Sequence, residues 1–167
     1  MKQSEVAEYI DLKKEDLVEF TASLIRARPV NPYFVNETES EKKVQEVIKN
    51  KLLDLGLEVI EIPVDFAALD SYKGRPGYTP GVTDTVSFRD RPNLLARLPG
   101  VDPENAPSVL LSGHCDVVAA DDEELWEFPP FSGIVSDGKI YGRGASDMLG
   151  GLAGMVYAIE AIINSGF

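Results

Sequence analysis

The stretch Leu110-Leu111-Ser112-Gly113-His114-Cys115-Asp116-Val117-Val118 decides the fold. Together with Val109, its first residues form an apolar run typical of a strand buried on both faces, so a strand is expected over residues 108–113. His114, the only histidine in the chain, follows at the end of that strand. Ligands bind at this end of the strands in open α/β sheets, and His114 is therefore the first candidate for a functional residue.

Helical and strand patterns surround this stretch. Apolar residues at helical spacing predict a helix over residues 12–28, and a capping box at 38–41 with Gly56 predicts a second over 39–55. The other elements expected are a helix over 147–165, strands over 57–64 and 93–98, a long loop over 65–91, and a hairpin over 134–141 turning at Asp137-Gly138. Helices interleaved with buried strands predict an α/β fold, with three α/β/α layers around a mostly parallel sheet.

Composition restricts the class of protein. The net charge is −12, from 16 basic and 28 acidic side chains, which argues against binding to nucleic acid or to an anionic membrane. No apolar run approaches the roughly 20 residues that span a bilayer, and the first residues are not a secretory signal. The single cysteine, Cys115, excludes an internal disulfide and is compatible with a reducing cytoplasm.

The first candidate site is formed by His114 and Asp116. Side chains alternate along a strand, so these two point to one side and Cys115 to the other. Asp116 can then accept a hydrogen bond from one imidazole nitrogen while the other nitrogen faces a metal ion. The alternative is a purely structural His–Asp hydrogen bond. A cysteine peptidase is disfavoured because His114 cannot act as the base for a thiol that faces away from it.

The second candidate is Asp147 in the stretch Gly142-Arg143-Gly144-Ala145-Ser146-Asp147-Met148. A carboxylate at the start of a helix can bind a cation, or it can simply cap the helix. The glycines do not predict a phosphate site: a dinucleotide fingerprint needs glycine where Asp147 stands, and the Gly-Lys-Ser/Thr of a P-loop is missing.

These motifs together resemble the aminoacylase, acetylornithine deacetylase, succinyl-diaminopimelate desuccinylase and glutamate carboxypeptidase family of di-zinc hydrolases. The resemblance rests on the segments 114–118, 126–131, 137–144 and 147–151 and on the strand start at 91–95. It implies a zinc-exopeptidase-like fold with two zinc ions, His114 as a ligand of one ion and Asp147 bridging both. It further implies that Asp116 is the catalytic partner of His114 and that the Asp147-Met148 peptide bond is cis.

The chain also departs from the family pattern. Leu149 stands where the family usually has lysine, and the family's Glu-Glu pair, late histidine and lid or dimerisation domain would follow after Phe167. We therefore expect the 167 residues to be the N-terminal part of the catalytic domain, inactive alone and weak in zinc binding. The expected parent protein is a hydrolase of an N-acyl amino acid or small peptide, with zinc, cobalt or manganese, and a homodimer is one expected form of the full-length protein. The alternative is a non-catalytic α/β binding or scaffold module.

Overall fold

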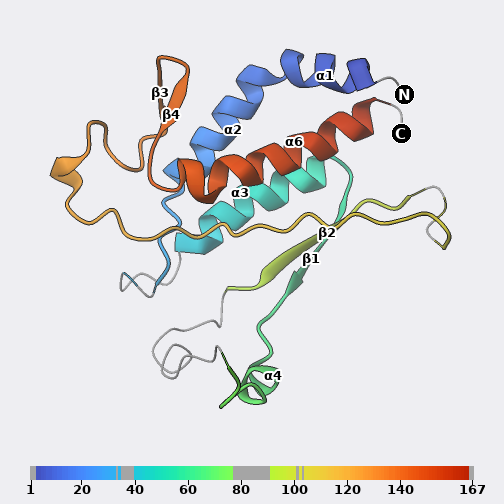
Figure 1. The fold of residues 1–167 in the computed structure, drawn as a ribbon, viewed down its shortest axis with the longest axis horizontal. Helices are drawn as coiled ribbons and strands as arrows, with labels where there is room; N and C mark the ends of the chain where they lie inside the picture. The colour runs from blue at the N-terminus through green and yellow to red at the C-terminus, as the bar shows by residue number, and fades with distance from the viewer. Residues whose placement is uncertain are drawn as a thin grey trace.

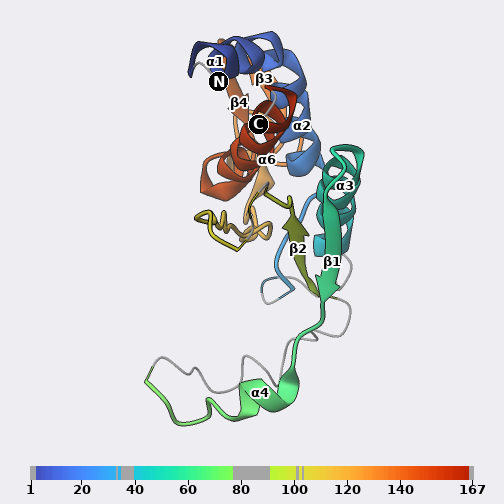
Figure 2. The same ribbon diagram turned by 90° about the vertical axis from the view of Figure 1, so that its right-hand side faces the viewer.

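The computed structural model describes residues 3–32, 34, 40–76, 91–100, 102 and 104–165. Four helices lie against one another on one side of the molecule (Figure 1). They are α1 (Gln3–Leu12), α2 (Lys14–Arg26), α3 (Ser40–Asp54) and α6 (Gly150–Asn164). The ribbon of β1 (Glu58–Ile62) and β2 (Asn93–Arg97) leads away from them towards the short helix α4 (Phe66–Asp70), which lies apart from the other helices (Figures 1 and 2).

The core forms where α2, α3 and α6 pack together. Leu24 and Ile25 of α2, Val44 of α3 and Ala153 of α6 are fully buried. These residues lie on the apolar stripes of their helices, so packing the helices together removes these apolar side chains from water. The helix predicted over residues 12–28 is α2, and a further helix, α1, precedes it, with Lys13 between the two. Helix α1 was not expected.

A buried ion pair ties three of the helices together. Lys51 Nζ of α3 lies 2.6 Å from Glu160 Oε2 of α6, and the other oxygen of Glu160 accepts a hydrogen bond of 3.0 Å from the Tyr9 hydroxyl of α1. Lys51 also lies over the Tyr157 ring, 4.6 Å from its centroid. A buried carboxylate needs partners of this kind because it has lost its hydration.

The first turns of α3 are also joined to the residues just before β2. Arg91 pairs with Glu41 through two hydrogen bonds, and both side chains are buried. Gln45 donates to the Pro92 carbonyl oxygen at 2.6 Å. The long loop therefore returns to the body of the molecule at a defined point. Residues 77–90 of that loop, and Thr38 and Glu39 of the predicted capping box, lie outside the described residues.

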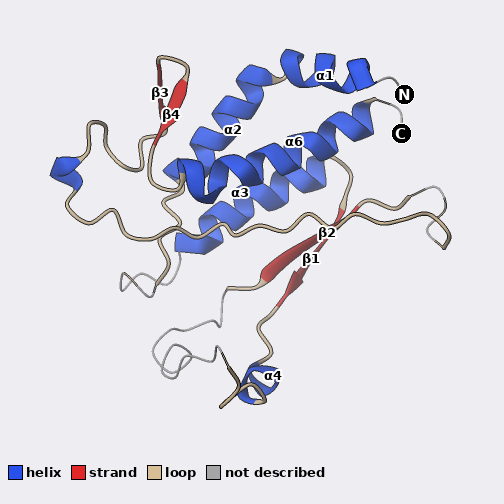
Figure 3. Ribbon diagram, in the orientation of Figure 1, coloured by secondary structure: helices blue, strands red, loops and turns tan. Residues whose placement is uncertain are grey.

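The strands that the structure describes pair antiparallel (Figure 3). β1 pairs with β2 in the register Ile60↔Leu95, and β3 (Ile134–Ser136) pairs with β4 (Lys139–Tyr141). The predicted hairpin turn at Asp137-Gly138 is confirmed, with positive φ angles of 50° and 73° that suit a two-residue connection. The α/β class holds. A mostly parallel sheet is not seen in the described residues, where the one parallel pairing is an isolated bridge between Val30 and Val117.

The strand predicted over residues 108–113 is not formed. These residues belong to no ladder in the described part of the chain, and Val109 and Leu110 are 85% and 79% exposed. An apolar run predicts burial only where other strands and helices are present to cover it. Here no described strand forms a ladder with the segment.

One stretch, Ala145–Asn164, is long and apolar enough to cross a bilayer by length and composition, with a mean hydropathy of 1.3. The expectation that no segment has this length is corrected for this stretch. It nevertheless packs against α1 and α2, and its Glu160 carboxylate is paired inside the domain. The core helix of a folded domain can pass the same test of length and composition, so the test by itself does not predict a membrane span.

Candidate metal centre

The His114 segment is fixed beside the end of α2 by two backbone hydrogen bonds. Val117 donates to the Pro29 carbonyl oxygen at 2.8 Å, and Asn31 donates to the Val117 carbonyl oxygen at 2.9 Å. Val117 itself is buried in the core. The three residues before it therefore have a defined position although they belong to no sheet.

The loop that carries Asp147 packs directly against this segment. Gly144 has a φ of 81°, and a side chain there would overlap the Cγ1 methyl group of Val117. A Cβ on Gly113 would lie 2.9 Å from Cε of Met148, and the His114 backbone N–H lies 3.3 Å from the Met148 sulfur. The two stretches can approach this closely because glycine stands at both contacts.

Asp147 lies within a single π-helical turn, Ala145–Leu149, just before α6. Its backbone is not helical, with φ −132° and ψ 100°. Helix α6 begins at Gly150, after Leu149, without a side-chain cap. The helix predicted from residue 147 therefore begins three residues later than expected, and the alternative that Asp147 caps the helix is wrong. The predicted cis peptide bond between Asp147 and Met148 is confirmed.

His114 lies between the two predicted carboxylates. Its Nε2 is 3.0 Å from Oδ1 of Asp147. Its Nδ1 is 3.0 Å from the Asp116 carbonyl oxygen and 3.3 Å from Asp116 Oδ1. The structure thus brings all three predicted site residues together, and Asp116 contacts the imidazole nitrogen opposite to the one that faces Asp147.

The site is open to solvent on the Asp147 side. The side chains of His114 and Asp147 are 48% and 88% exposed. Burial alone lowers the pKa of His114, but hydrogen bonds to the Asp116 backbone and the Asp147 carboxylate, with the charges of both acids, outweigh it and hold the pKa above its ordinary value. Both carboxylates therefore favour positive charge at this point, whether on the ring or on a bound cation.

Cys115 has a different environment from its neighbours. Burial raises the pKa of its thiol to about 12, and the charges of Glu41 and Asp116 act in the same direction. A thiol of this kind is not ionised at neutral pH and is a poor nucleophile. Cys115 is partly buried and packs against the core.

The donor atoms fit a zinc ion in kind and spacing. Two ligands of a tetrahedral zinc ion at about 2.1 Å lie about 3.4 Å apart, and a small movement would open the 3.0 Å separation of His114 Nε2 and Asp147 Oδ1 to that value. The described residues contain no group of three or more His, Cys, Asp or Glu side chains that could hold a metal ion. His114 and Asp147 therefore offer two of the roughly four ligands that zinc needs.

One residue of the site was not predicted as part of it. Asn31 donates its side-chain amide to Asp116 Oδ2 at 2.8 Å. No local sequence signal identifies this contact, because the two residues are far apart in the chain.

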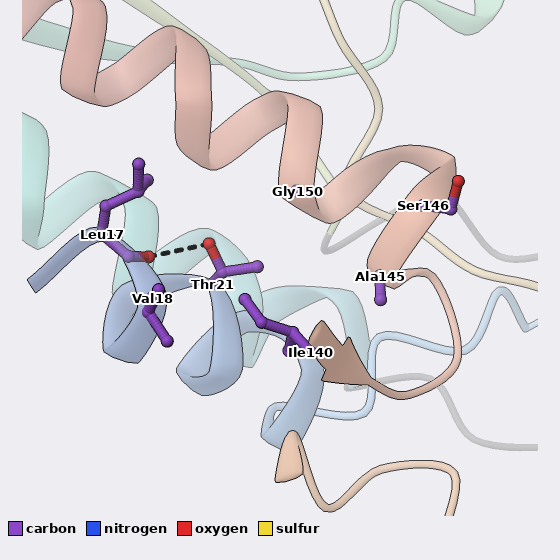
Figure 4. Close-up of a pocket in the computed structure, with 7 residues that line it drawn as sticks. All are labelled: Leu17, Val18, Thr21, Ile140, Ala145, Ser146 and Gly150. Carbon is purple, nitrogen blue, oxygen red and sulfur yellow. Dashed lines mark hydrogen bonds between the residues drawn. The ribbon is translucent and has the colours of Figure 1, made fainter. Parts of the chain in front are cut away.

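A hollow of about 390 Å³ lies between α2, β4 and the turn that carries Asp147 (Figure 4). Its lining residues include Leu17, Thr21 and Ile140, and none of them is titratable. The Thr21 hydroxyl donates to the Leu17 carbonyl oxygen at 2.8 Å. The hollow supplies no acid, base or metal ligand.

Comparison with known proteins assigns this arrangement to a class of hydrolases. Residues 110–167, which include His114, Asp116 and Asp147, match the sequence profile described as Peptidase family M20/M25/M40. The predicted family resemblance is thereby confirmed.

Two curated relatives extend the match. The chain is 43% identical over 75 residues to the N-formyl-4-amino-5-aminomethyl-2-methylpyrimidine deformylase of Halalkalibacterium halodurans, covering 45% of this chain and 18% of the relative. It is 30% identical over 146 residues to the succinyl-diaminopimelate desuccinylase of Hahella chejuensis, covering 87% of this chain and 29% of the relative.

A solved structure shares the fold. The chain superimposes on the di-peptidase Dug1p from Saccharomyces cerevisiae with a TM-score of 0.69 and 22% identity, over 98% of this chain and 31% of the other. The chain thus spans less than a third of the length of each of these relatives.

Proposed function

We propose that this chain is part of a metal-dependent hydrolase that cleaves an amide bond of an N-acyl amino acid or small peptide. The observation that carries the proposal is the 3.0 Å approach of His114 Nε2 to Asp147 Oδ1. The relatives support the class of reaction: one is a deformylase, one a desuccinylase and one a di-peptidase by name. Within such an enzyme these residues would form the N-terminal part of the catalytic domain.

Each residue has a separate task in this proposal. Asp116 holds the Nδ1 side of His114, so that Nε2 presents its lone pair to a cation. Asp147 supplies a carboxylate whose second oxygen is free to reach another cation. A zinc ion bound there would polarise the scissile carbonyl group and lower the pKa of a water molecule. Cobalt or manganese would suit the same ligands.

Calorimetric titration of the 167-residue chain with zinc tests the metal site. Because His114 and Asp147 supply only two ligands, we expect binding weaker than about 1 μM. His114→Ala should abolish the binding, and Asp147→Asn should weaken it at least about tenfold. Asp137→Asn is the matched control, since this carboxylate lies in the exposed hairpin turn, and it should leave the affinity unchanged. Equal zinc affinity in the wild-type chain and His114→Ala would refute the site.

A hydrolysis assay with N-formyl and N-succinyl amino acids and dipeptides accompanies the titration. We expect no turnover by the 167 residues alone, because the described site contains no further carboxylate placed to act as general base. Turnover together with sub-micromolar zinc affinity would contradict this expectation. Failure to bind zinc at all would favour the non-catalytic module instead.

A further inference from the structure

The main chain of His114 is joined to the Asp147 loop through a sulfur atom. The backbone N–H of His114 donates to Sδ of Met148 at 3.3 Å. Met148 follows directly after Asp147 in the chain, so a single hydrogen bond connects the segments of both candidate ligands. Residues 108–113 belong to no ladder in the described part of the chain. The sulfur therefore gives this N–H the partner that a neighbouring strand would otherwise supply.

The end of the Met148 side chain packs against a position that must be glycine. A Cβ on Gly113 would lie 2.9 Å from Cε and 3.3 Å from Sδ of Met148, and a Cβ on Gly151 would lie 3.7 Å from the same Cε. The thioether thus contacts both the segment that carries His114 and the start of α6. Met148 is half-buried, whereas the Asp147 beside it is exposed. Packing therefore fixes the residue next to the carboxylate and leaves the carboxylate open to solvent.

The chemistry of a thioether suits this contact. Methionine is unbranched, so its sulfur can reach a backbone N–H while its methyl group packs on apolar surface. The sulfur is a weak acceptor, and a leucine of similar volume has no acceptor at all. Leucine in place of Met148 would keep most of the packing and leave the His114 N–H without this partner. One substitution therefore separates the hydrogen bond from the packing.

We propose that Met148 is a positioning residue of the His114–Asp147 site. Its sulfur holds the main chain of His114 against the loop that carries Asp147, and this contact sets the 3.0 Å approach of the imidazole to the carboxylate. The importance of that approach for metal binding rests on the proposed function. The positioning itself is a property of the metal-free chain and is measured without a metal ion.

Two NMR measurements on the metal-free 167-residue chain report the contact and its effect. The chain contains one histidine, so nuclear Overhauser cross-peaks from its ring protons to the Asp147 β protons are assigned directly and report the approach. Hydrogen exchange of the His114 amide reports the bond to sulfur. The Val117 amide, which donates to the Pro29 carbonyl oxygen at 2.8 Å, is the internal reference for exchange.

Met148→Leu should weaken the ring–Asp147 cross-peak at least about twofold and speed exchange of the His114 amide at least about threefold relative to Val117. Met155→Leu is the matched control, because Met155 is also half-buried and lies further along α6. It should leave both values unchanged. An equal loss of the cross-peak in Met155→Leu would overturn the proposal, since the effect would then not depend on the contact with His114.

Gly113→Ala tests the contact from its other side. The new Cβ would lie 2.9 Å from the flexible end of Met148, so it should displace that side chain and weaken the same cross-peak. Gly100→Ala is the control for this variant, because nothing lies within 4 Å of a Cβ at that position. It should leave the cross-peak unchanged.

A merely structural role for Met148 would lower the thermal midpoint and leave the cross-peak as it is. A folded Met148→Leu chain with the wild-type cross-peak therefore overturns the proposal, whether or not the His114 amide exchanges faster. If Met148→Leu loses its helical circular dichroism, Gly113→Ala decides by the same criterion.

If neither variant folds, the wild-type spectrum decides. A cross-peak between the Met148 methyl group and the Gly113 α protons supports the proposal, and its absence overturns it. No metal ion takes part in these measurements. A failure to bind zinc would therefore count against the proposed function and leave the positioning by Met148 as it stands.

Discussion

Three consecutive side chains, His114, Cys115 and Asp116, have very different surroundings. His114 is half exposed between two carboxylates, and Asp116 is held by Asn31. Cys115 faces the interior, where burial keeps its thiol protonated. Successive side chains point to opposite sides of an extended backbone, and this alternation accounts for the difference. It needs no sheet, because it depends only on the local φ and ψ angles.

Cys115 should react slowly with alkylating reagents. With a pKa of about 12, its thiolate fraction at pH 8 is about a thousandfold below that of an ordinary cysteine. We expect alkylation by iodoacetamide, followed by mass spectrometry, to be at least about a hundredfold slower in the folded chain than in urea. Similar rates in both conditions would show that the thiol is exposed and would reopen its role as a nucleophile.

At the scale of elements, the site exists because two loops and three helices are held in one arrangement. The loop after β4 reaches residues 114–117 through Gly144, and α6 continues from that loop into the core. The ion pair of Lys51 and Glu160 ties α6 to α3, and Tyr9 adds α1. Replacing Gly144 or Lys51 should therefore lower the free energy of unfolding by more than the size of the side-chain change suggests.

Gly144→Ala should destabilise the fold strongly. The new methyl group would overlap Val117 and would also occupy a left-handed backbone position, so we expect a loss of about 3 kcal/mol or more in the free energy of unfolding. Gly138→Ala is the matched control, because Gly138 has a φ of 73° and open space around it. Its cost should be about 1 kcal/mol. Urea denaturation measures both, and equal losses would show that the contact with Val117 is unimportant.

Lys51→Met should leave a buried carboxylate without its cation. Glu160 is 6% exposed and Lys51 is 23% exposed, so we expect a loss of about 2–4 kcal/mol at neutral pH.

Lys49→Met, from the same helix, tests the contrast with a solvent-exposed pair. Lys49 and Glu61 lie 2.7 Å apart in water, and the loss should stay below about 1 kcal/mol. Chemical denaturation of the two variants under one set of conditions compares them. A Lys51→Met chain as stable as Lys49→Met would mean that Glu160 finds water or another partner.

At the scale of the whole molecule, apolar surface is distributed unevenly. The four packed helices bury their stripes, whereas residues 109–111 present three consecutive large apolar side chains to solvent. The extended backbone of this segment is also without a ladder partner in the described part of the chain. Unpaired extended backbone with apolar side chains is a template for association between chains.

The 167-residue chain should therefore self-associate as its concentration rises, and Leu110→Lys should reduce this. Stability should change little, because Leu110 is already exposed. Leu125→Lys is the control, as Leu125 is 83% exposed in the short helix Glu123–Leu125. Size-exclusion chromatography with light scattering gives the mass at each concentration. A wild-type chain that stays monomeric throughout would remove the basis for this prediction.

Much of the molecule follows from local sequence patterns. Apolar periodicity located α3 and α6 to within three residues at each end, and Asp137-Gly138 identified the hairpin. The motifs around His114 and Asp147 identified the family and the residues of the candidate site. These signals are readable because helices, turns and alternating strands depend on residues a few positions apart.

The tertiary structure determined the features that local sequence patterns could not predict. The apolar run at 109–111 looks the same in sequence whether neighbouring strands cover it or not, and here none of the described strands does. The contact of Asn31 with Asp116 and the 3.0 Å approach of His114 to Asp147 join residues that are distant along the chain. The sequence alone singled out His114, Asp116 and Asp147 as candidates, whereas the packing of Gly144 on Val117 brings their segments together, because such contacts depend on the whole fold.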